Sequence, residues 1–235
     1  MEKLLVDTIE ENFKRINENI CNAALKAGRN SKEIALLAAT KTVPPDIINY
    51  AISLGITDIG ENRVQELNSK YDSLKLENCN LHMIGHLQTN KVKKIVGKVK
   101  CIQSVDSLKL MTEINRVSSI NNITSDILVE VNIGREKNKS GVLPEYLEDL
   151  LVKSIEFKSV KIKGLMAIPP ICEEKSKIRK YFSELNKIFI DIKRKKLDNI
   201  CMDILSMGMS DDYVEAILEG STMIRIGSSL FGKRI

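Results

Sequence analysis

The sequence predicts an α/β protein that folds as a single (β/α)8 barrel, a TIM barrel, with an extra N-terminal helix. Three observations predict this fold class. Short apolar strands alternate with amphipathic helices, the alternation yields eight strands, and the pattern fits into 235 residues without a linker or a change of composition. Such alternation is typical of a parallel sheet, and eight compact units favour a sheet that closes on itself.

An open, doubly wound sheet is the structural alternative. It normally has a G-x-G-x-x-G turn after its first strand, whereas this chain has Thr-Lys-Thr-Val-Pro-Pro at 40–45. We therefore predict one barrel domain over 1–235, in which 1–30 carry the extra helix.

The extra helix is predicted over 3–27, because apolar residues recur there at three- and four-residue steps. Gly28 and Asn30 end it. The stripe consists of Leu5, Ile9, Phe13, Ile16, Ile20 and Ala24.

Strands and helices then follow in turn. Pro44 and Pro45, Ser107, Pro144 and the acids at 211–212 are typical helix starts. The strands are predicted at 34–40, 58–60, 81–84, 101–105, 127–131, 164–168, 202–206 and 223–226. The helices are predicted at 45–54, 63–75, 89–97, 107–120, 143–153, 174–196 and 211–219.

Composition excludes several function classes. The net charge of +5 is mild and spread along the chain, and tryptophan is absent, so we expect no nucleic-acid partner. The five cysteines form no C-x-x-C pair, which favours a reducing, cytoplasmic location without disulfides. The acidic N-terminus is not a signal peptide, and no apolar stretch is long enough to span a membrane.

Lys41 is placed where the first strand ends and a helix is about to begin. Burial of a lysine lowers the pKa of its amine. The neutral amine can then form a Schiff base with an aldehyde or ketone. Taken alone, the window favours a lysine that simply reaches solvent.

Two turns that contain glycine and serine change this interpretation. They follow the seventh and eighth strands, at 206–210 and 225–229, where barrels often bind phosphate. Glycine lets backbone N–H groups approach an anion, and serine hydroxyls donate to it. Ordinary tight turns are the alternative. A phosphate site opposite Lys41 indicates a phosphorylated carbonyl compound.

No metal site is predicted. His82 and His86 are four residues apart, but Gly85 lies between them at a strand end and no H-E-x-x-H pattern is present. At 134–141 a polar loop should lie over the barrel mouth, where Lys139 either faces solvent or helps to close the site.

Five motifs resemble the pyridoxal phosphate homeostasis protein family (YggS/PROSC type), which is related in fold to the N-terminal barrel of alanine racemase. They occur in order at 38–44, 60–66, 82–91, 205–212 and 224–232. In sequence they read A-A-T-K-T-V-P, G-E-N-R-V-Q-E, H-M-I-G-H-L-Q-T-N-K, L-S-M-G-M-S-D-D and I-R-I-G-S-S-L-F-G.

The resemblance implies that pyridoxal 5'-phosphate (PLP) is the cofactor and that Lys41 forms the internal aldimine with it. It implies that Arg225 faces the pyridine nitrogen and that Asn62 and His82 line the pocket near the ring. Ser206, Gly227 and Ser228 would hold the phosphate of PLP, largely through backbone N–H groups, and Met207 would belong to the same site.

Low turnover is expected for two reasons. A guanidinium such as that of Arg225 discourages protonation of the ring nitrogen, which makes the cofactor a poorer electron sink. Related racemases carry a second domain with a catalytic tyrosine, and no residues for it are expected after the eighth strand. The chain's own tyrosines lie within or beside predicted helices, at Tyr50, Tyr71, Tyr146, Tyr181 and Tyr213.

The expected function is therefore non-catalytic PLP homeostasis by a monomer that could supply apo PLP-dependent enzymes, with no catalytic residue assigned. A PLP-dependent amino-acid enzyme, such as a weak racemase, is one alternative. The other is an aldolase that uses Lys41 without a cofactor.

Overall fold

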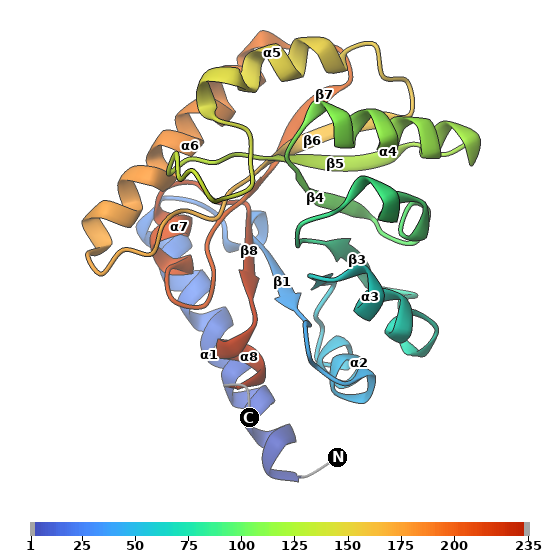
Figure 1. Ribbon diagram of the computed structural model, residues 1–235. Coiled ribbons are helices and arrows are strands. Elements are labelled where there is room, and N and C mark those ends of the chain that lie inside the picture. Colours follow the sequence, from blue (N-terminus) through green and yellow to red (C-terminus); the bar gives the residue numbers. More distant parts are fainter. Residues whose placement is uncertain (1–2, 233–235) are drawn as a thin grey trace.

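The computed structural model describes residues 3–232, with side chains from residue 6 onward, so Leu5 of the predicted stripe lies outside the described side chains. Eight parallel strands form a closed barrel in the order β1 to β8, which confirms the predicted fold class (Figure 1). The strands are β1 (Ala35–Ala39), β2 (Asp58–Glu61), β3 (Asn80–Met83), β4 (Cys101–Val105), β5 (Ser125–Glu130), β6 (Val160–Met166), β7 (Ile200–Ser206) and β8 (Met223–Ile226).

Helices surround this barrel on the outside. The described residues also form three short 3-10 helices: η1 (Ser31–Glu33), η2 (Tyr71–Ser73) and η3 (Thr89–Lys94). The α-helices are α1 (Lys3–Lys26), α2 (Pro45–Ser53), α3 (Val64–Lys70), α4 (Leu108–Ile120), α5 (Pro144–Ser154), α6 (Lys175–Lys195), α7 (Tyr213–Leu218) and α8 (Ser228–Phe231).

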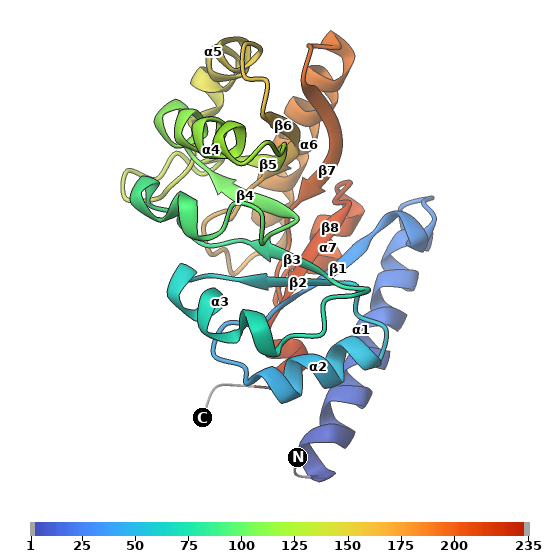
Figure 2. The same ribbon diagram turned by 90° about the vertical axis from the view of Figure 1, so that its right-hand side faces the viewer.

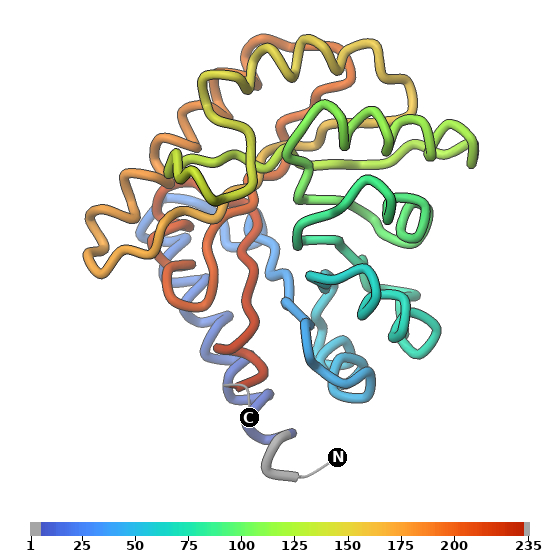
Figure 3. Tube along the Cα trace, viewed as in Figure 1, coloured from blue at the N-terminus to red at the C-terminus, as the bar shows by residue number. Residues whose placement is uncertain are grey.

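The barrel closes by pairing its first and last strands. Ala35 pairs with Met223 and Leu37 with Arg225, and the trace in Figure 3 shows the blue first strand beside the red last strand. Carboxyl ends of parallel strands share one rim, so residues from the two ends of the sequence meet there.

Helix α1 packs outside the barrel against α7 and α8 (Figure 2). From Ile9 onward its apolar stripe is buried, or half-buried at Phe13, and Ile9 and Ile16 have almost no exposure. Asn12 Nδ2 donates to the carbonyl of Leu230 at 3.0 Å, and Asn19 Nδ2 donates to the Tyr213 hydroxyl at 2.8 Å. The extra helix therefore supports the segment that follows the last strand.

The barrel interior is only partly apolar. Its apolar part consists of two small clusters, one around Leu37, Ile84 and Met223 and the other around Cys101, Leu128 and Met166. The main core lies between strands and helices instead. Several polar side chains share the interior: Asp58, His82, Gln103, Glu130, Ser206 and Arg225.

Some predicted boundaries are wrong. The segment predicted as a helix at 89–97 forms the 3-10 turn η3, and the helix predicted at 63–75 is α3 followed by η2. The predicted start of β6 at 164 is also too late, because the strand begins at Val160. The segment after β8, expected as a turn, continues into the short helix α8.

Candidate functional site

A cavity of about 860 Å³ opens at the carboxyl ends of the strands. Five of the predicted site residues line it: Lys41, Asn62, Arg225, Gly227 and Ser228. They come from the ends of β1, β2 and β8, so the closure of the barrel brings them together.

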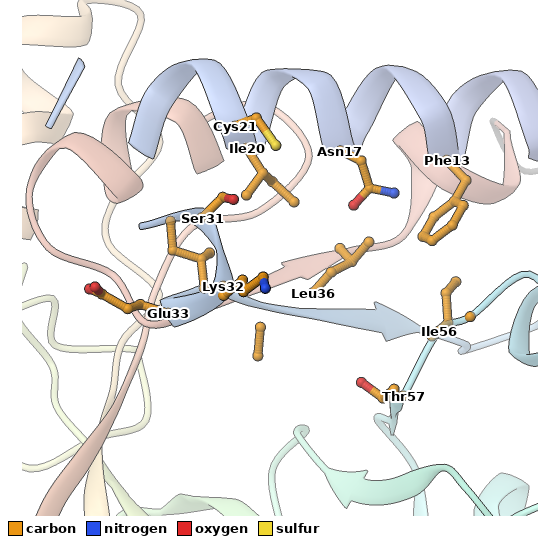
Figure 4. Close-up of a pocket in the computed structure, with 13 residues that line it drawn as sticks. Phe13, Asn17, Ile20, Cys21, Ser31, Lys32, Glu33, Leu36, Ile56 and Thr57 are labelled. Atoms are coloured by element: carbon orange, nitrogen blue, oxygen red, sulfur yellow. The ribbon is translucent and has the colours of Figure 1, made fainter. Parts of the chain in front are cut away.

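A second cavity, of about 430 Å³, lies at the opposite end of the strands (Figure 4). Asn17, Ile20 and Cys21 of α1 face the start of β1 there, and Thr57 lies at the start of β2. Barrel proteins place their chemistry at the carboxyl ends of the strands, so the larger cavity is the candidate site.

Lys41 lies in the turn between β1 and α2 and is partly buried. The backbone on both sides of it is fixed. Thr40 N donates to the carbonyl of Gly60 at 2.9 Å, and Thr40 Oγ1 donates to Glu61 Oε1 at 2.7 Å. Thr42 has a left-handed φ of +65°, and its N–H donates to Glu66. The conformation of this turn is therefore set by contacts with β2 and α3.

Lys70, at the end of α3, also fixes the turn that carries Lys41. Its Nζ donates to the Thr40 carbonyl at 2.9 Å, to Glu61 Oε1 at 2.9 Å and to Glu66 Oε1 at 2.6 Å. Lys70 is only 8% exposed, and Glu61 is fully buried. One buried ammonium thus connects the Lys41 turn to two carboxylates, and we refer to Lys70, Glu61 and Glu66 as the lysine clamp.

The two carboxyls of the lysine clamp have opposite pKa shifts. Burial raises the pKa of Glu61 and outweighs the hydrogen bonds from Lys70 and Thr40. Burial also acts on Glu66, but the hydrogen bonds from Lys70 and Thr42 outweigh it there and lower the pKa. Glu61 Oε2 is the only buried side-chain nitrogen or oxygen among the described residues that has no partner.

Arg225 is 4% exposed and lies at the wall of the cavity. Its Nη1 donates to Ser206 Oγ at 2.7 Å, and its Nη2 donates to the carbonyl of Ala167 at 3.0 Å. Burial lowers its pKa to about 10, against the charges of Glu130 and Asp212, so it stays a cation at neutral pH. Burial and the charge of Asp106 raise the pKa of Glu130 to about 7, while Arg225 opposes this shift.

The two Gly/Ser turns contact each other. Ser229 N donates to Ser210 Oγ at 3.2 Å, and Ser229 Oγ donates to the Ser210 carbonyl at 3.4 Å. Gly208 has a φ of +94°, and a Cβ there would lie 2.6 Å from the Cβ of Ala216, so only glycine fits. These turns form one wall of the cavity through Ser210, Gly227 and Ser228.

Three predicted site residues lie beneath the cavity and do not line it. His82 is 2% exposed, and its ring hydrogen bonds to Asp58 and Gln103 inside the barrel. Ser206 is fully buried, with its hydroxyl between Arg225 and Gln103. Met207 is also fully buried. Their predicted roles toward a cofactor stay predictions.

Ser210, the last residue of the predicted turn at 206–210, lines the cavity as well. Sequence reasoning missed Asp211 and Phe231, which also line the cavity. Both lie within the motifs at 205–212 and 224–232, but no role was assigned to either. Lys139 is exposed, and its loop is held by Asn132, whose Nδ2 donates to the Glu136 carbonyl at 2.8 Å.

Tyrosines, metal-ligating side chains and membrane-spanning helices are considered next for the described residues. None of the chain's five tyrosines lines the cavity. Within residues 3–232, no group of three or more His, Cys, Asp or Glu side chains is arranged to hold a metal ion. Over the same residues, no helix has both the length and the apolar character that crossing a membrane requires.

Comparison with known proteins gives a consistent relationship. The family model for the N-terminal domain of alanine racemase matches residues 7–234. A pyridoxal phosphate homeostasis protein of Aquifex aeolicus is 45% identical over 224 residues, which cover 95% of this chain and 97% of that protein. The protein of the same name from Escherichia coli K12 is 33% identical and covers 97% of this chain and 98% of its own.

Solved structures agree. PipY of Synechococcus elongatus, with PLP bound, has a TM-score of 0.80 and 29% identity over 92% of this chain and 100% of its own. An alanine racemase of Clostridium difficile shares the fold at 14% identity and a TM-score of 0.75, and the match covers 57% of that longer chain. The resemblance carried by the five motifs is thereby confirmed, and the chain belongs to the pyridoxal phosphate homeostasis protein family, whose barrel is that of the alanine racemase N-terminal domain.

Proposed function

We propose that this protein binds PLP in the cavity at the carboxyl ends of its strands and acts in PLP homeostasis, with little or no turnover. One observation carries the proposal. Lys41 and Arg225, at the ends of two paired strands, line the same cavity as the Gly227-Ser228 turn. They offer an amine for the PLP aldehyde, a cation that can donate to the ring nitrogen, and backbone N–H groups for the phosphate.

The residues fit this cofactor. The cavity volume of about 860 Å³ is within the range of small-molecule sites. The amine of Lys41 would bind the aldehyde carbon, and the N–H groups at the start of α8, around Gly227 and Ser228, would receive the phosphate. When bound, PLP supplies an electron sink conjugated to the linked amine.

Two features of the site support low turnover. Arg225 can only donate, so it would leave the pyridine nitrogen unprotonated and weaken the electron sink. Racemisation also needs an acid or base on each face of the cofactor, and no tyrosine lines the cavity to supply the second. We therefore assign no catalytic residue to this chain.

The absorption spectrum of the purified protein tests the cofactor proposal. With PLP, the wild type should absorb in the visible, and borohydride should fix the cofactor to Lys41, as peptide mass mapping would show. Lys41→Ala should remain colourless, whereas the matched variant Lys109→Ala, at an exposed position of α4, should behave as the wild type. A wild type that stays colourless with added PLP would contradict the proposal and leave the aldolase alternative.

A weak racemase is the second candidate, favoured by one observation. Asp211 is exposed and lines the same cavity as Lys41, where its carboxylate could act as a second group that moves a proton. Racemisation of alanine by the PLP-loaded protein, lost in Asp211→Asn, would support this candidate. No measurable racemisation with bound PLP is the outcome that the homeostasis proposal expects.

Delivery of PLP to apo-enzymes by a cytoplasmic monomer completes the proposal. All five cysteines, Cys21, Cys79, Cys101, Cys172 and Cys201, are free thiols, which supports a reducing compartment. Mixing the loaded protein with an apo PLP-dependent enzyme, with and without a trap for free PLP, would distinguish direct transfer from release into solution.

A further inference from the structure

A row of hydrogen bonds crosses the barrel interior beneath the cavity. Arg225 Nη1 donates to Ser206 Oγ at 2.7 Å, and Ser206 Oγ donates to Gln103 Oε1 at 2.7 Å. Gln103 Nε2 lies 3.1 Å from His82 Nδ1, and His82 Nε2 lies 3.0 Å from Asp58 Oδ1. We call these five residues, which come from β8, β7, β4, β3 and β2, the barrel relay.

The two ends of the barrel relay fix its direction. Arg225 has no acceptor atom, so it can only donate. Asp58 lies at the other end, and although burial raises its pKa, the hydrogen bonds from His82, Thr57 and Asn80 lower it overall. Asp58 is therefore an ionised acceptor at neutral pH, and each group between the two ends has to accept on one side and donate on the other.

The amide of Gln103 can be oriented from its neighbours. Its Nε2 lies 3.1 Å from His82 Nδ1 and 3.2 Å from Met223 Sδ, which gives each of its two N–H groups an acceptor. The reversed amide would point its oxygen at the thioether and lose the bond from Ser206. Gln103 thus donates to Nδ1, and His82 carries its proton on Nε2, facing Asp58.

The orientation of the Arg225 guanidinium depends on the barrel relay, because Arg225 is buried without a direct ion pair to a described carboxylate. No carboxylate of residues 3–232 forms a salt bridge with it, and its only other hydrogen bond is to the carbonyl of Ala167. Two of its five N–H groups are used in these bonds, and the residue lines the cavity. The orientation of the guanidinium is therefore set by two acceptors, the Ala167 carbonyl and the Ser206 hydroxyl, and Gln103 sets the direction of that hydroxyl.

We propose that Gln103, His82 and Asp58 are positioning residues that hold the Arg225 guanidinium in one orientation toward the cavity. As regards the cofactor, this rests on the proposed function, because Arg225 then faces the pyridine nitrogen of PLP. The hydrogen-bond direction within the barrel relay does not depend on the cofactor, so it can be tested separately.

The first test uses the cofactor-free protein. The chain has only two histidines, so long-range proton–nitrogen correlation spectra contain two imidazole patterns, and His86→Gln identifies the one from His82. We expect His82 to show a single tautomer with its proton on Nε2. The Gln103→Met variant, which keeps side-chain length and removes the amide, should keep this proton on Nε2, because Asp58 still accepts it, and should shift the Nδ1 resonance of His82, because Nδ1 loses its donor. A proton on Nδ1, or mixed tautomers in the wild type, would overturn the relay.

The second test measures the cofactor. Gln103→Met should weaken PLP binding by about fivefold, the effect expected for losing roughly one net hydrogen bond at Arg225, and should shift the absorption band of bound PLP. Ser206→Ala, the smaller change in volume, should do the same. Gln65→Met, the same substitution at an exposed position of α3, is the matched control. Circular dichroism and thermal unfolding establish that each variant is folded.

The outcomes separate the two proposals. A folded Gln103→Met and a folded Ser206→Ala with wild-type PLP affinity and spectrum would overturn the positioning role while leaving PLP binding intact. A wild type that binds no PLP, but shows the Nε2 proton on His82, would overturn the proposed function and leave the hydrogen-bond direction established.

Discussion

Burial determines the ionisation of Glu130, an acid in the barrel interior near Arg225. Its pKa of about 7 in the folded protein lies above the ordinary value of 4.5. The folded state therefore holds the proton more tightly than the unfolded chain between these two values. Stability falls as the pH rises through this window, because ionisation of the buried carboxyl becomes a cost to the folded state only.

Glu130→Gln should remove this dependence in the cofactor-free protein. At pH 5 the variant and the wild type should have similar free energies of unfolding, because both side chains are largely neutral in the folded state. At pH 8 the variant should be more stable by roughly 2–3 kcal/mol. Urea unfolding at the two pH values measures this. An unchanged difference between the proteins would show that Glu130 is ionised when folded at both.

The lysine clamp gives a second prediction at this scale. Lys70→Met leaves the carboxylate of Glu61 buried without its cation, and should lower the free energy of unfolding by roughly 3–5 kcal/mol. The double variant Lys70→Met/Glu61→Gln removes both charges and should recover much of the loss. Urea unfolding of both variants checks this, and equal destabilisation in the two would exclude the unpaired charge as the cause.

Residues of the site were predicted from the sequence where a strand end and a motif coincide. Lys41 and Gly227 follow apolar strands and Arg225 lies near the end of one, and the barrel rule places all three at one rim. The burial of His82 and Ser206 beneath the cavity was not predicted. Whether a strand residue faces the cavity or the layer below it depends on the strand register, and a single sequence does not contain that information.

Strand β6 shows why element boundaries depend on tertiary structure. Val160 and Ile162 are buried while Lys161 is exposed, so the strand starts with alternating burial and lacks the continuous apolar run expected of a buried strand. At Gly164 the register with β5 and β7 shifts, and its φ of +150° is a backbone conformation that residues other than glycine rarely adopt. An ideal Cβ there would lie 1.8 Å from the carbonyl oxygen of Ile204.

Gly164→Ala should therefore disturb the pairing of β6 with β7 and lower stability by more than roughly 3 kcal/mol. Gly55→Ala is the matched control, because Gly55 also has a positive φ of +103° but no atom within 4 Å of its would-be Cβ. Its loss should be about 1 kcal/mol, from backbone strain alone. Thermal unfolding of both variants compares them, and equal losses would rule out the steric explanation.

Helix type was harder to predict than helix position. The segment at 89–97 carries apolar residues at helical spacing, but it forms the short 3-10 helix η3, in which Val92 is buried, and Ile95 is buried directly after it. Propensity and pattern do not distinguish a single 3-10 turn from a short α-helix, since both bury the same residues.

At the scale of the whole molecule, the extra helix α1 stabilises the rim that forms the site. Asn12 bonds to Leu230 in α8, beside the residues that line the cavity. Asn12→Ala should lower stability by about 1–2 kcal/mol by leaving a buried carbonyl without its donor, and should weaken PLP binding. Unfolding and PLP titration check this. Destabilisation without any change in PLP affinity would show that α1 acts on the fold and not on the site.

The pairing of β1 with β8 also has a consequence for synthesis on the ribosome. Lys41 leaves the ribosome first, and Arg225 and the Gly227-Ser228 turn follow only after the six strands between β1 and β8. A nascent chain that has exposed seven strands has the reactive amine but no completed barrel and no partner groups for the phosphate or the ring. Stable binding of PLP should therefore begin only when β8 has emerged and paired with β1. Nascent chains still attached to the ribosome should have no PLP bound.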